Sequence, residues 1–234
     1  MATDMTAELA VELDDVRYAW PGQAACLRLR TLQVRHGESL FVHGASGSGK
    51  STLLSLLALV LAPQGGHLRL LGRDTSGWGG AARDRFRADH IGVVFQQFNL
   101  LPYLPVLANA ELPLRMSALR RDRSPAGEAA ALLRSLGIEG ELLRRTPSQL
   151  SVGQQQRVAA ARALVGSPEI VIADEPTSAL DELRRDEFMQ LLMAGCARVG
   201  STLVFVSHDV RLAGRFDRAV ALSALNDAAV EHAR

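Results

Sequence analysis

Apolar and polar residues alternate along the first third of the chain, whereas the later apolar residues come in short unbroken runs. Leu27-Arg28-Leu29-Arg30 and Leu68-Arg69-Leu70 have the two-residue period of strands that bury one face, which predicts an antiparallel sheet beside the main core. Runs that are apolar on both faces are instead typical of strands inside a parallel sheet. Four such strands are predicted, over Leu40–His43, Ile91–Phe95, Ile170–Ala173 and Leu203–Val206.

A helix-rich stretch lies between the second and third of these strands, at about residues 105–164. It begins after Leu101-Pro102-Tyr103-Leu104-Pro105, where the prolines indicate a boundary. It contains predicted helices over Glu128–Leu136 and Gln154–Leu164. We therefore expect one α/β domain over residues 1–234, in which a core with an N-terminal antiparallel β subdomain spans residues 1–96 and 165–234, and an inserted helical subdomain spans residues 97–164.

Composition and charge narrow the class of protein. Of the 234 residues, 47% are hydrophobic and 22% are charged, which is close to the averages for soluble globular proteins. The longest uncharged apolar run, residues 52–62, is shorter than the ~20 residues that a membrane-spanning helix needs. A total of 26 Lys and Arg against 25 Asp and Glu gives a net charge of +1, which argues against general binding to nucleic acid.

The N-terminus and the cysteines favour a cytosolic protein. The first residues lack the basic-then-apolar pattern of a signal peptide. Cys26 and Cys196 have neither CxxC spacing nor histidines at metal-ligand spacing. We therefore expect two reduced, buried thiols.

Residues 44–51 match the phosphate-binding pattern G-x-x-x-x-G-K-[ST] completely, and Lys50 is the only lysine in the chain. The pattern follows the predicted strand Leu40–His43 and opens an apolar helix predicted over Ser51–Leu61, which is the context that such a loop requires. Glycines let backbone N–H groups turn toward an anion, and the helix N-terminus adds partial positive charge. We therefore expect a P-loop NTPase core in which Lys50 reaches the β- and γ-phosphates, Ser51 ligates Mg²⁺, and the nucleotide-binding residues include Gly44, Ser46, Gly47, Gly49 and Thr52.

Polar residues follow the other three predicted parallel strands at the point where each strand ends. Asp174 and Glu175 follow Ile170–Ala173, where Asp174 is placed to hold Mg²⁺ and Glu175 to polarise the attacking water. Gln96 follows the second strand and His208 the fourth. Ligands of open parallel sheets bind at the carboxyl ends of the strands, so we expect these side chains to converge on the phosphate loop.

The stretch Leu150-Ser151-Val152-Gly153-Gln154 looks like the LSGGQ signature of ABC transporters, and the chain resembles their nucleotide-binding subunit over nearly its whole length. The resemblance implies a RecA-like parallel sheet core and ATP hydrolysis with Mg²⁺. Ser151 also fits a helix N-cap, with Gln154 completing a capping box, and both roles are compatible because a helix N-terminus binds anions.

The resemblance assigns roles to further residues. Trp20 matches the aromatic ring that stacks on adenine, with Tyr18 as the alternative, and packing within a strand is the other reading of either ring. Gln96 matches the glutamine that touches Mg²⁺ and signals to the membrane partner, and His208 the histidine that contacts the γ-phosphate. Residues 178–181 match the D-loop, which includes the nucleotide-binding candidate Asp181.

The resemblance also implies partners. Two copies of the chain would pair head to tail, so that Ser151, Gly153 and Gln154 of one copy complete the nucleotide site of the other. ATP would close this homodimer, and hydrolysis by Glu175 would reopen it. The dimer would act on a membrane permease from the cytoplasmic face of the inner membrane.

Two further stretches, Phe95 to Pro102 and Asn109 to Leu114, look like the lipoprotein-release and macrolide-exporter branch. This resemblance implies a permease that exports or extracts a substrate, with or without a periplasmic adaptor as a further partner. The alternatives are the ATPase of a polar amino-acid importer and a non-transport ABC ATPase of cell division. The permease is expected to dock through a groove lined by the apolar residues Phe98, Leu100, Leu101, Tyr103 and Leu104, although half of these side chains can instead belong to the subdomain core.

Val152 departs from the family pattern because it replaces the first glycine of the signature pair. A β-branched residue is an outlier if the backbone there needs φ > 0. The retained Gly153 keeps the expected N–H contact with the γ-phosphate. We expect the Val152→Gly variant to hydrolyse ATP at a similar or higher rate, measured as phosphate release, and a collapse of that rate would show that the position is misread.

Overall fold

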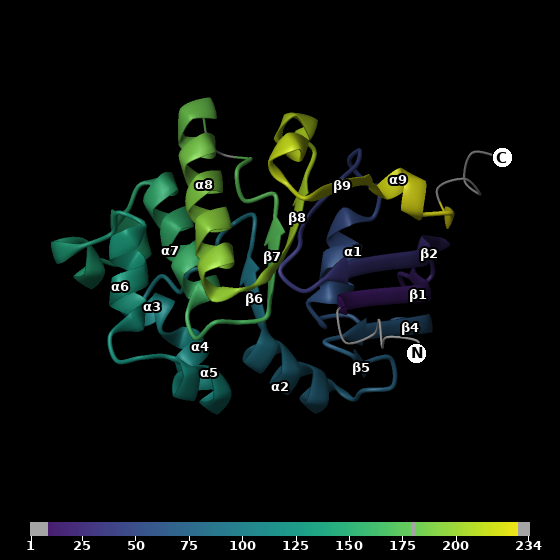
Figure 1. The fold of residues 1–234 in the computed structure, drawn as a ribbon, viewed down its shortest axis with the longest axis horizontal. Coiled ribbons are helices and arrows are strands. Elements are labelled where there is room, and N and C mark those ends of the chain that lie inside the picture. Colours follow the sequence, from purple (N-terminus) through teal and green to yellow (C-terminus); the bar gives the residue numbers. More distant parts are fainter. Residues whose placement is uncertain (1–8, 179–180, 229–234) are drawn as a thin grey trace, which may run out of the picture. The chain divides into compact units, whose positions relative to one another are not determined.

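The computed structural model describes residues 9–178 and 181–228 (Figure 1). The chain divides into two compact units. Unit 1 comprises Met1–Asp84 and Thr202–Arg234, and unit 2 comprises Arg85–Ser201. This division follows contacts within the chain and differs from the subdomain limits expected at residues 97 and 165, which stay a prediction.

Unit 1 contains the antiparallel sheet that the alternating residues predict. Its strand order is β2-β1-β4-β5. Leu13 on the central strand faces Leu32 on one neighbour and Leu68 on the other, and all three side chains are buried. The bounds are β1 Leu9–Ala19, β2 Ala25–Arg35, β4 Gly65–Leu70 and β5 Arg73–Asp74.

Three parallel strands complete the sheet structure of unit 1. Strand β3 pairs with both β8 and β9, and Leu40, Phe41 and Val42 along it are fully buried, as expected of a run that is apolar on both faces. The elements of this part are β3 Ser39–His43, α1 Lys50–Leu57, β8 Thr202–Ser207, η4 Val210–Arg215, β9 Arg218–Ala221 and α9 Leu222–Leu225.

Helix α1 is shorter than the predicted Ser51–Leu61. It ends at Leu57 because Leu59 has a left-handed backbone with φ 55°, which breaks the helical repeat. The amides of Val60 and Leu61 then both bond back to the Ser55 carbonyl. Apolar residues continue past the helix end, so hydrophobicity alone overestimated its length.

Unit 2 contains a parallel strand pair and most of the helices. Strands β6 and β7 pair with Val94 opposite Ala173, and the helix-rich stretch of the sequence is confirmed (Figure 1). The bounds are β6 Ile91–Val94, α3 Val106–Ala110, α4 Leu112–Met116, α5 Ala118–Arg123, α6 Glu128–Ser135, η2 Gly140–Arg144, η3 Pro147–Gln149, α7 Val152–Leu164, β7 Ile170–Asp174 and α8 Glu182–Val199, while α2, Gly80–His90, spans the division between the units.

Helix α7 lies directly against strand β6. A Cβ atom at Gly92 would lie 2.1 Å from the Ala163 carbonyl oxygen, so only glycine permits this approach. The buried Arg120 closes the carboxyl end of the helix, where Nε donates to the Val165 carbonyl at 2.9 Å and Nη2 to the Ala163 carbonyl at 2.8 Å. Burial lowers the pKa of Arg120 to about 10, so its charge persists at neutral pH and opposes the negative end of the helix dipole.

The described helices can be compared with the length and apolar character that a membrane-spanning helix needs. Within residues 9–178 and 181–228, every helix is too short or too polar to cross a bilayer.

Candidate nucleotide site

The phosphate loop of unit 1 connects strand β3 to helix α1, as the sequence predicts. Gly47 and Gly49 have φ of 77° and 97°, which L side chains rarely adopt. Gly49 is also the N-cap of α1, and a Cβ atom there would lie 2.7 Å from the side chain of Leu27. The two glycines therefore allow the chain to curl tightly before the helix begins.

Lys50 lies at the first position of α1 and is buried against this loop. Its Nζ donates to the carbonyl oxygens of Gly44 at 2.8 Å and Ala45 at 2.9 Å, which holds the ammonium over the end of β3. The nearby Ser48 Oγ is buried and lacks a hydrogen-bond partner among the described residues. An ammonium and an unpaired hydroxyl at a helix N-terminus fit a polyphosphate, which accepts hydrogen bonds from both.

His208 lies at the same edge of the parallel strands as the phosphate loop. Strand β8 runs beside β3 with Ser207 opposite His43, so His208 and Gly44 are the next residues along neighbouring parallel strands. The His208 side chain is exposed. Within unit 1, the structure thus brings together two of the strand ends that the sequence predicts to converge.

The two candidate adenine-stacking rings differ in exposure. Tyr18 is 8% exposed on β1, whereas Trp20 just beyond the strand is 41% exposed and meets Tyr18 edge to face, with ring centroids 5.3 Å apart. The Tyr18 carbonyl lies 3.5 Å from the Cys26 thiol, which lies 4.0 Å from the Thr52 hydroxyl on α1. Trp20 is therefore the accessible ring at this end of β1, and Tyr18 is a packing residue.

The carboxylate pair of unit 2 lies at the end of strand β7, where Asp174 is the last strand residue and Glu175 follows it. Val94 of β6 lies opposite Ala173 of β7, so the carboxylate pair and the Gln96 turn after β6 lie at one edge. Glu175 has φ 41°, a left-handed conformation that costs an ordinary residue roughly 1–2 kcal/mol. Such outliers cluster at functional sites, which favours Glu175 as a reacting group.

Gln156 on helix α7 holds the turn after these carboxylates. Its side chain is fully buried, and Nε2 donates to the Pro176 carbonyl at 2.5 Å. This contact was not predicted from the sequence. The available signal was the helical spacing of Gln156, Ala159, Ala160 and Ala163, which puts the Gln156 side chain on the buried face of α7.

The signature segment forms the start of helix α7. The predicted capping box is confirmed, because Ser151 Oγ accepts from the Gln154 amide and Gln154 Oε1 accepts from the Ser151 amide. Val152 is the first helical residue and is not among the residues with positive φ, so its β-branch causes no backbone strain. A Cβ atom built on Gly153 meets nothing within 4 Å among the described residues.

The loop after β6 contains a contact that the sequence did not predict. Phe98 and Asn99 have φ of 60° and 48°, and Arg162 on α7 donates to both of their carbonyl oxygens. Phe98 is buried, whereas Tyr103 is 72% exposed. Phe98 therefore belongs to the core and is not part of the apolar surface cluster that the sequence predicted. Leu100, Leu101 and Leu104 are half-buried.

The remaining candidates occupy helix and loop ends. Asp181 is the N-cap of α8, where Oδ1 accepts from the Arg184 amide at 3.0 Å. Residues 179–180 of the predicted D-loop lie outside the described residues.

The two cysteines differ in burial. Cys196 is buried, which raises the pKa of its thiol to about 12, but Cys26 is only half-buried, contrary to expectation. Cys26 is the second residue of β2 and lies next to the exposed residues 21–24, which accounts for this difference.

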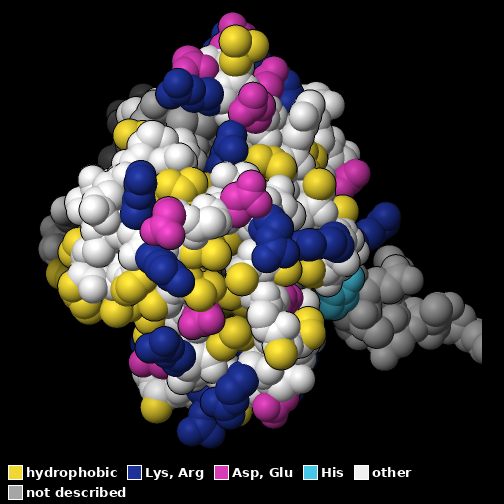
Figure 2. Space-filling model, turned by 90° about the vertical axis from the view of Figure 1, so that its left-hand side faces the viewer, with side chains coloured by type: hydrophobic (Ala, Val, Ile, Leu, Met, Phe, Trp, Pro, Cys, Tyr) yellow, Lys and Arg dark blue, Asp and Glu magenta, His cyan; other side chains and the backbone are white. Residues whose placement is uncertain are grey.

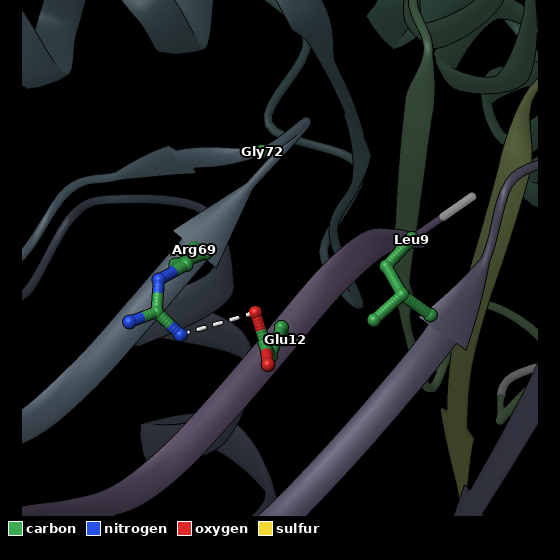
Figure 3. Close-up of a pocket in the computed structure, with 4 residues that line it drawn as sticks. All are labelled: Leu9, Glu12, Arg69 and Gly72. Carbon is green, nitrogen blue, oxygen red and sulfur yellow. Dashed lines mark hydrogen bonds and ion pairs between the residues drawn. The ribbon is translucent and has the colours of Figure 1, made fainter. Parts of the chain in front are cut away.

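A cavity of about 400 Å³ in unit 1 offers a different chemistry (Figure 3). Glu12 and Arg69 lie opposite each other on β1 and β4, and Arg69 Nη1 lies 3.1 Å from Glu12 Oε2. Leu9 and Gly72 complete the lining. Because the two charges pair with each other, this cavity is a poorer phosphate site than the glycine loop.

The predicted site residues thus fall into two groups. Unit 1 carries the phosphate loop, Trp20 and His208, and unit 2 carries Gln96, the signature segment, the Asp174–Glu175 pair and Asp181. Each group lies at strand or helix ends within its own unit.

Comparison with known proteins extends this picture. The family model described as "ABC transporter" matches residues 27–178. The chain is 45% identical to an uncharacterized ABC transporter ATP-binding protein, YbbA of Escherichia coli K12, over 82% of this chain and 83% of that protein. It is 44% identical to the lipoprotein-releasing system ATP-binding protein LolD of Anaeromyxobacter dehalogenans, over 91% and 90%. It is also 39% identical to the macrolide export ATP-binding/permease protein MacB of Rhodopseudomonas palustris, where 93% of this chain covers 33% of that longer protein.

Solved structures agree with the sequence relatives. The dimeric ATP-binding cassette MJ0796 in a post-hydrolysis state with ADP and Pi is 36% identical, with a TM-score of 0.79, and the match covers 93% of this chain and 95% of that one. Phosphate loop, parallel strands and signature helix together define an ATP-hydrolysing P-loop NTPase with an antiparallel β sheet. The chain belongs to the ABC transporter family, as an ATP-binding subunit related to the LolD and MacB ATPases.

Proposed function

We propose that this ATPase works as a head-to-tail homodimer that drives a membrane permease, and that the permease exports or extracts a substrate. The observation that carries the dimer is Gly153. Glycine in a helix interior costs roughly 0.5–1 kcal/mol relative to alanine. Gly153 lies in the first turn of α7 with open space around it among the described residues, so no close approach within the described parts of the chain requires a glycine there. A surface that must accept a second molecule at close range supplies that requirement, and the ATP of a second copy is the group that the family resemblance places there.

The proposal assigns roles to the remaining residues of the site. Lys50 and the backbone of the phosphate loop bind the phosphates, Trp20 stacks on the adenine, and His208 contacts the γ-phosphate. Glu175 polarises the attacking water. These roles rest on the strand ends described above and on the family resemblance.

Magnesium fits the oxygen ligands that this chain offers. Ser51, Gln96 and Asp174 carry a hydroxyl, an amide and a carboxylate, which are ligands that Mg²⁺ accepts together with water and phosphate oxygens. The bound ion supplies neutralisation of the charge on the phosphates. Ser51 lies in unit 1, and Gln96 and Asp174 lie in unit 2.

The chain would work at the cytoplasmic face of the inner membrane. The permease would dock on unit 2. On the face shown in Figure 2, hydrophobic side chains gather between arginines and acids. Tyr103 is a large exposed ring in the segment that follows Gln96, which supports the loop around Tyr103 and Leu104 as the contact.

The names of the relatives favour export or extraction of a substrate, and the substrate classes in those names are lipoproteins and macrolides. A periplasmic adaptor belongs to the same proposal. An amino-acid importer or a cell-division regulator finds no such support among these relatives.

The dimer can be tested in the Glu175→Gln variant, which should bind ATP without hydrolysing it. We expect this variant to become a dimer with ATP and Mg²⁺, measured by light scattering during gel filtration. Adding Gly153→Ala should keep the protein monomeric, because the methyl group occupies the space that the second copy needs, while thermal stability without nucleotide stays equal or rises.

Gly80→Ala is the matched control for Gly153→Ala, since Gly80 also lies in a first helical turn with open space around it. In the same Glu175→Gln background, Gly80→Ala should still dimerise. A dimer formed equally well by the Gly153→Ala protein would contradict the proposed role of Gly153.

The adenine contact can be tested by fluorescence, because the chain has only two tryptophans, Trp20 and Trp78. We expect ATP to quench the emission of the Trp78→Phe variant, in which Trp20 remains, and to leave the Trp20→Phe variant unchanged. Loss of stacking in Trp20→Ala should cost about 1–3 kcal/mol of binding free energy. Unaltered ATP affinity in Trp20→Ala would reject the contact.

The permease contact can be tested by co-purification. Charged substitutions at Tyr103 and Leu104 should remove binding to the permease, because burying an unpaired charge in an apolar contact is costly. ATP binding by the isolated subunit should be unchanged. Co-purification that survives both substitutions would show that the permease docks elsewhere.

A further inference from the structure

Arg162 makes a two-pronged contact with the loop that follows Gln96. Its Nη1 donates to the Asn99 carbonyl at 2.7 Å, and its Nη2 donates to the Phe98 carbonyl at 2.5 Å. Both partners are main-chain atoms of consecutive residues in left-handed conformation. Arg162 is half-buried, and this burial lowers the pKa of its guanidinium.

Arginine suits this contact for a geometric reason. A guanidinium is planar and presents its N–H groups in a fixed fork, so one side chain can satisfy two neighbouring carbonyls at once. Two successive non-glycine residues with positive φ are unfavourable and persist only where the surroundings hold them. Arg162 is the side chain that bonds to both.

The held residues fix the turn that carries Gln96. The Phe98 amide donates to the Phe95 carbonyl at 3.0 Å, which closes a turn with Gln96 inside it. Beyond the held residues, the buried Asn109 side chain accepts from the Leu101 amide at 2.8 Å and donates to the Leu101 carbonyl at 3.0 Å. The loop is thus tied to α7 on one side and to α3 on the other.

We propose that Arg162 is a positioning residue that makes helix α7 and the Gln96 turn move as one body. Ser151 caps the first turn of α7 and Arg162 lies in its last turn, about 16 Å further along at 1.5 Å per residue. Rigid secondary elements such as a helix can carry coupling between the groups at their two ends. Whatever engages Ser151 would therefore shift Gln96, and whatever pushes on the loop would shift the signature segment. This inference rests on the proposed roles of Ser151 and Gln96.

Arg120 provides a matched control. It is another arginine of unit 2, fully buried where Arg162 is half-buried, and it also donates to main-chain carbonyls, in this case those of Ala163 and Val165. Its side-chain hydrogen bonds among the described residues go to the end of α7 and to Ile91 rather than to Phe98 or Asn99. Replacing either arginine with lysine keeps the charge but removes the fork.

The first measurement is amide hydrogen exchange in the full chain. We expect Arg162→Lys to speed exchange several-fold in residues 95–101 and to leave the end of α7 unchanged. Arg120→Lys should do the reverse, with faster exchange near Ala163 and Val165 and an unchanged loop. Equal exchange of residues 95–101 in the Arg162→Lys and unsubstituted proteins would overturn the proposal.

The second measurement is ATP hydrolysis at saturating Mg²⁺. Because misplaced catalytic groups act on the chemical step, Arg162→Lys should lower kcat about tenfold with little change in KM. Arg120→Lys should lower the melting temperature with kcat of the folded protein retained. A rise in KM without loss of kcat in Arg162→Lys would overturn the positioning role.

A double variant separates this proposal from the role proposed for Gln96. If Arg162 acts through Gln96, then Gln96→Ala/Arg162→Lys should have the kcat of Gln96→Ala alone. If the kcat of the double variant fell by the product of the two single-variant factors, the proposal would be overturned while the role of Gln96 stayed intact. A normal kcat in Gln96→Ala would instead reject the role of Gln96 itself, and with it any positioning of that residue.

Discussion

The structure of unit 2 depends on side chains that hydrogen-bond to backbone carbonyls around helix α7. Gln156 bonds to Pro176 beside the carboxylate turn, Arg162 bonds to Phe98 and Asn99 beside the Gln96 turn, and Arg120 closes the end of the helix. Each such bond contributes about 1 kcal/mol, but a buried carbonyl left without its partner costs about 1–3 kcal/mol. Loops that lack regular pairing are held in this way in fixed positions on one rigid helix.

The parts of this arrangement that obey local rules could be predicted from the sequence. Four of the five described parallel strands follow from their unbroken apolar runs, the phosphate loop from its glycines and lysine, and the capping box from Ser151 and Gln154. The contacts of Arg162 and Gln156 could not, because a backbone carbonyl carries no sequence signal and its partner lies far along the chain. The early end of α1 and the burial of Phe98 also depend on tertiary context that hydrophobicity does not record.

The same contacts place α7 beside the turns that carry Glu175 and Gln96. Ser151 at its N-cap is exposed, and Gly153 in its first turn is half-buried. Gln156 on its buried face bonds to the turn after Glu175, and the half-buried Arg162 in its last turn bonds to the loop after Gln96. Under the roles proposed for these residues, binding at the signature segment and chemistry at the carboxylates would be linked through one element of unit 2. The phosphate loop and His208 form their own group in unit 1. ATP between two copies would connect these groups, with each copy supplying a phosphate loop to one site and a signature segment to the other.

Complementation between two inactive variants tests this central claim most directly. Lys50→Ala disables the phosphate loop, and Ser151→Ala disables the signature segment. Each variant alone should hydrolyse ATP poorly, because both sites of its homodimer carry a defect. In a mixture, mixed dimers contain one site with both parts intact, so the account predicts that ATP hydrolysis by the mixture exceeds that of either variant alone. A mixture no more active than its components would contradict the account, because it would mean that the two groups act within a single chain.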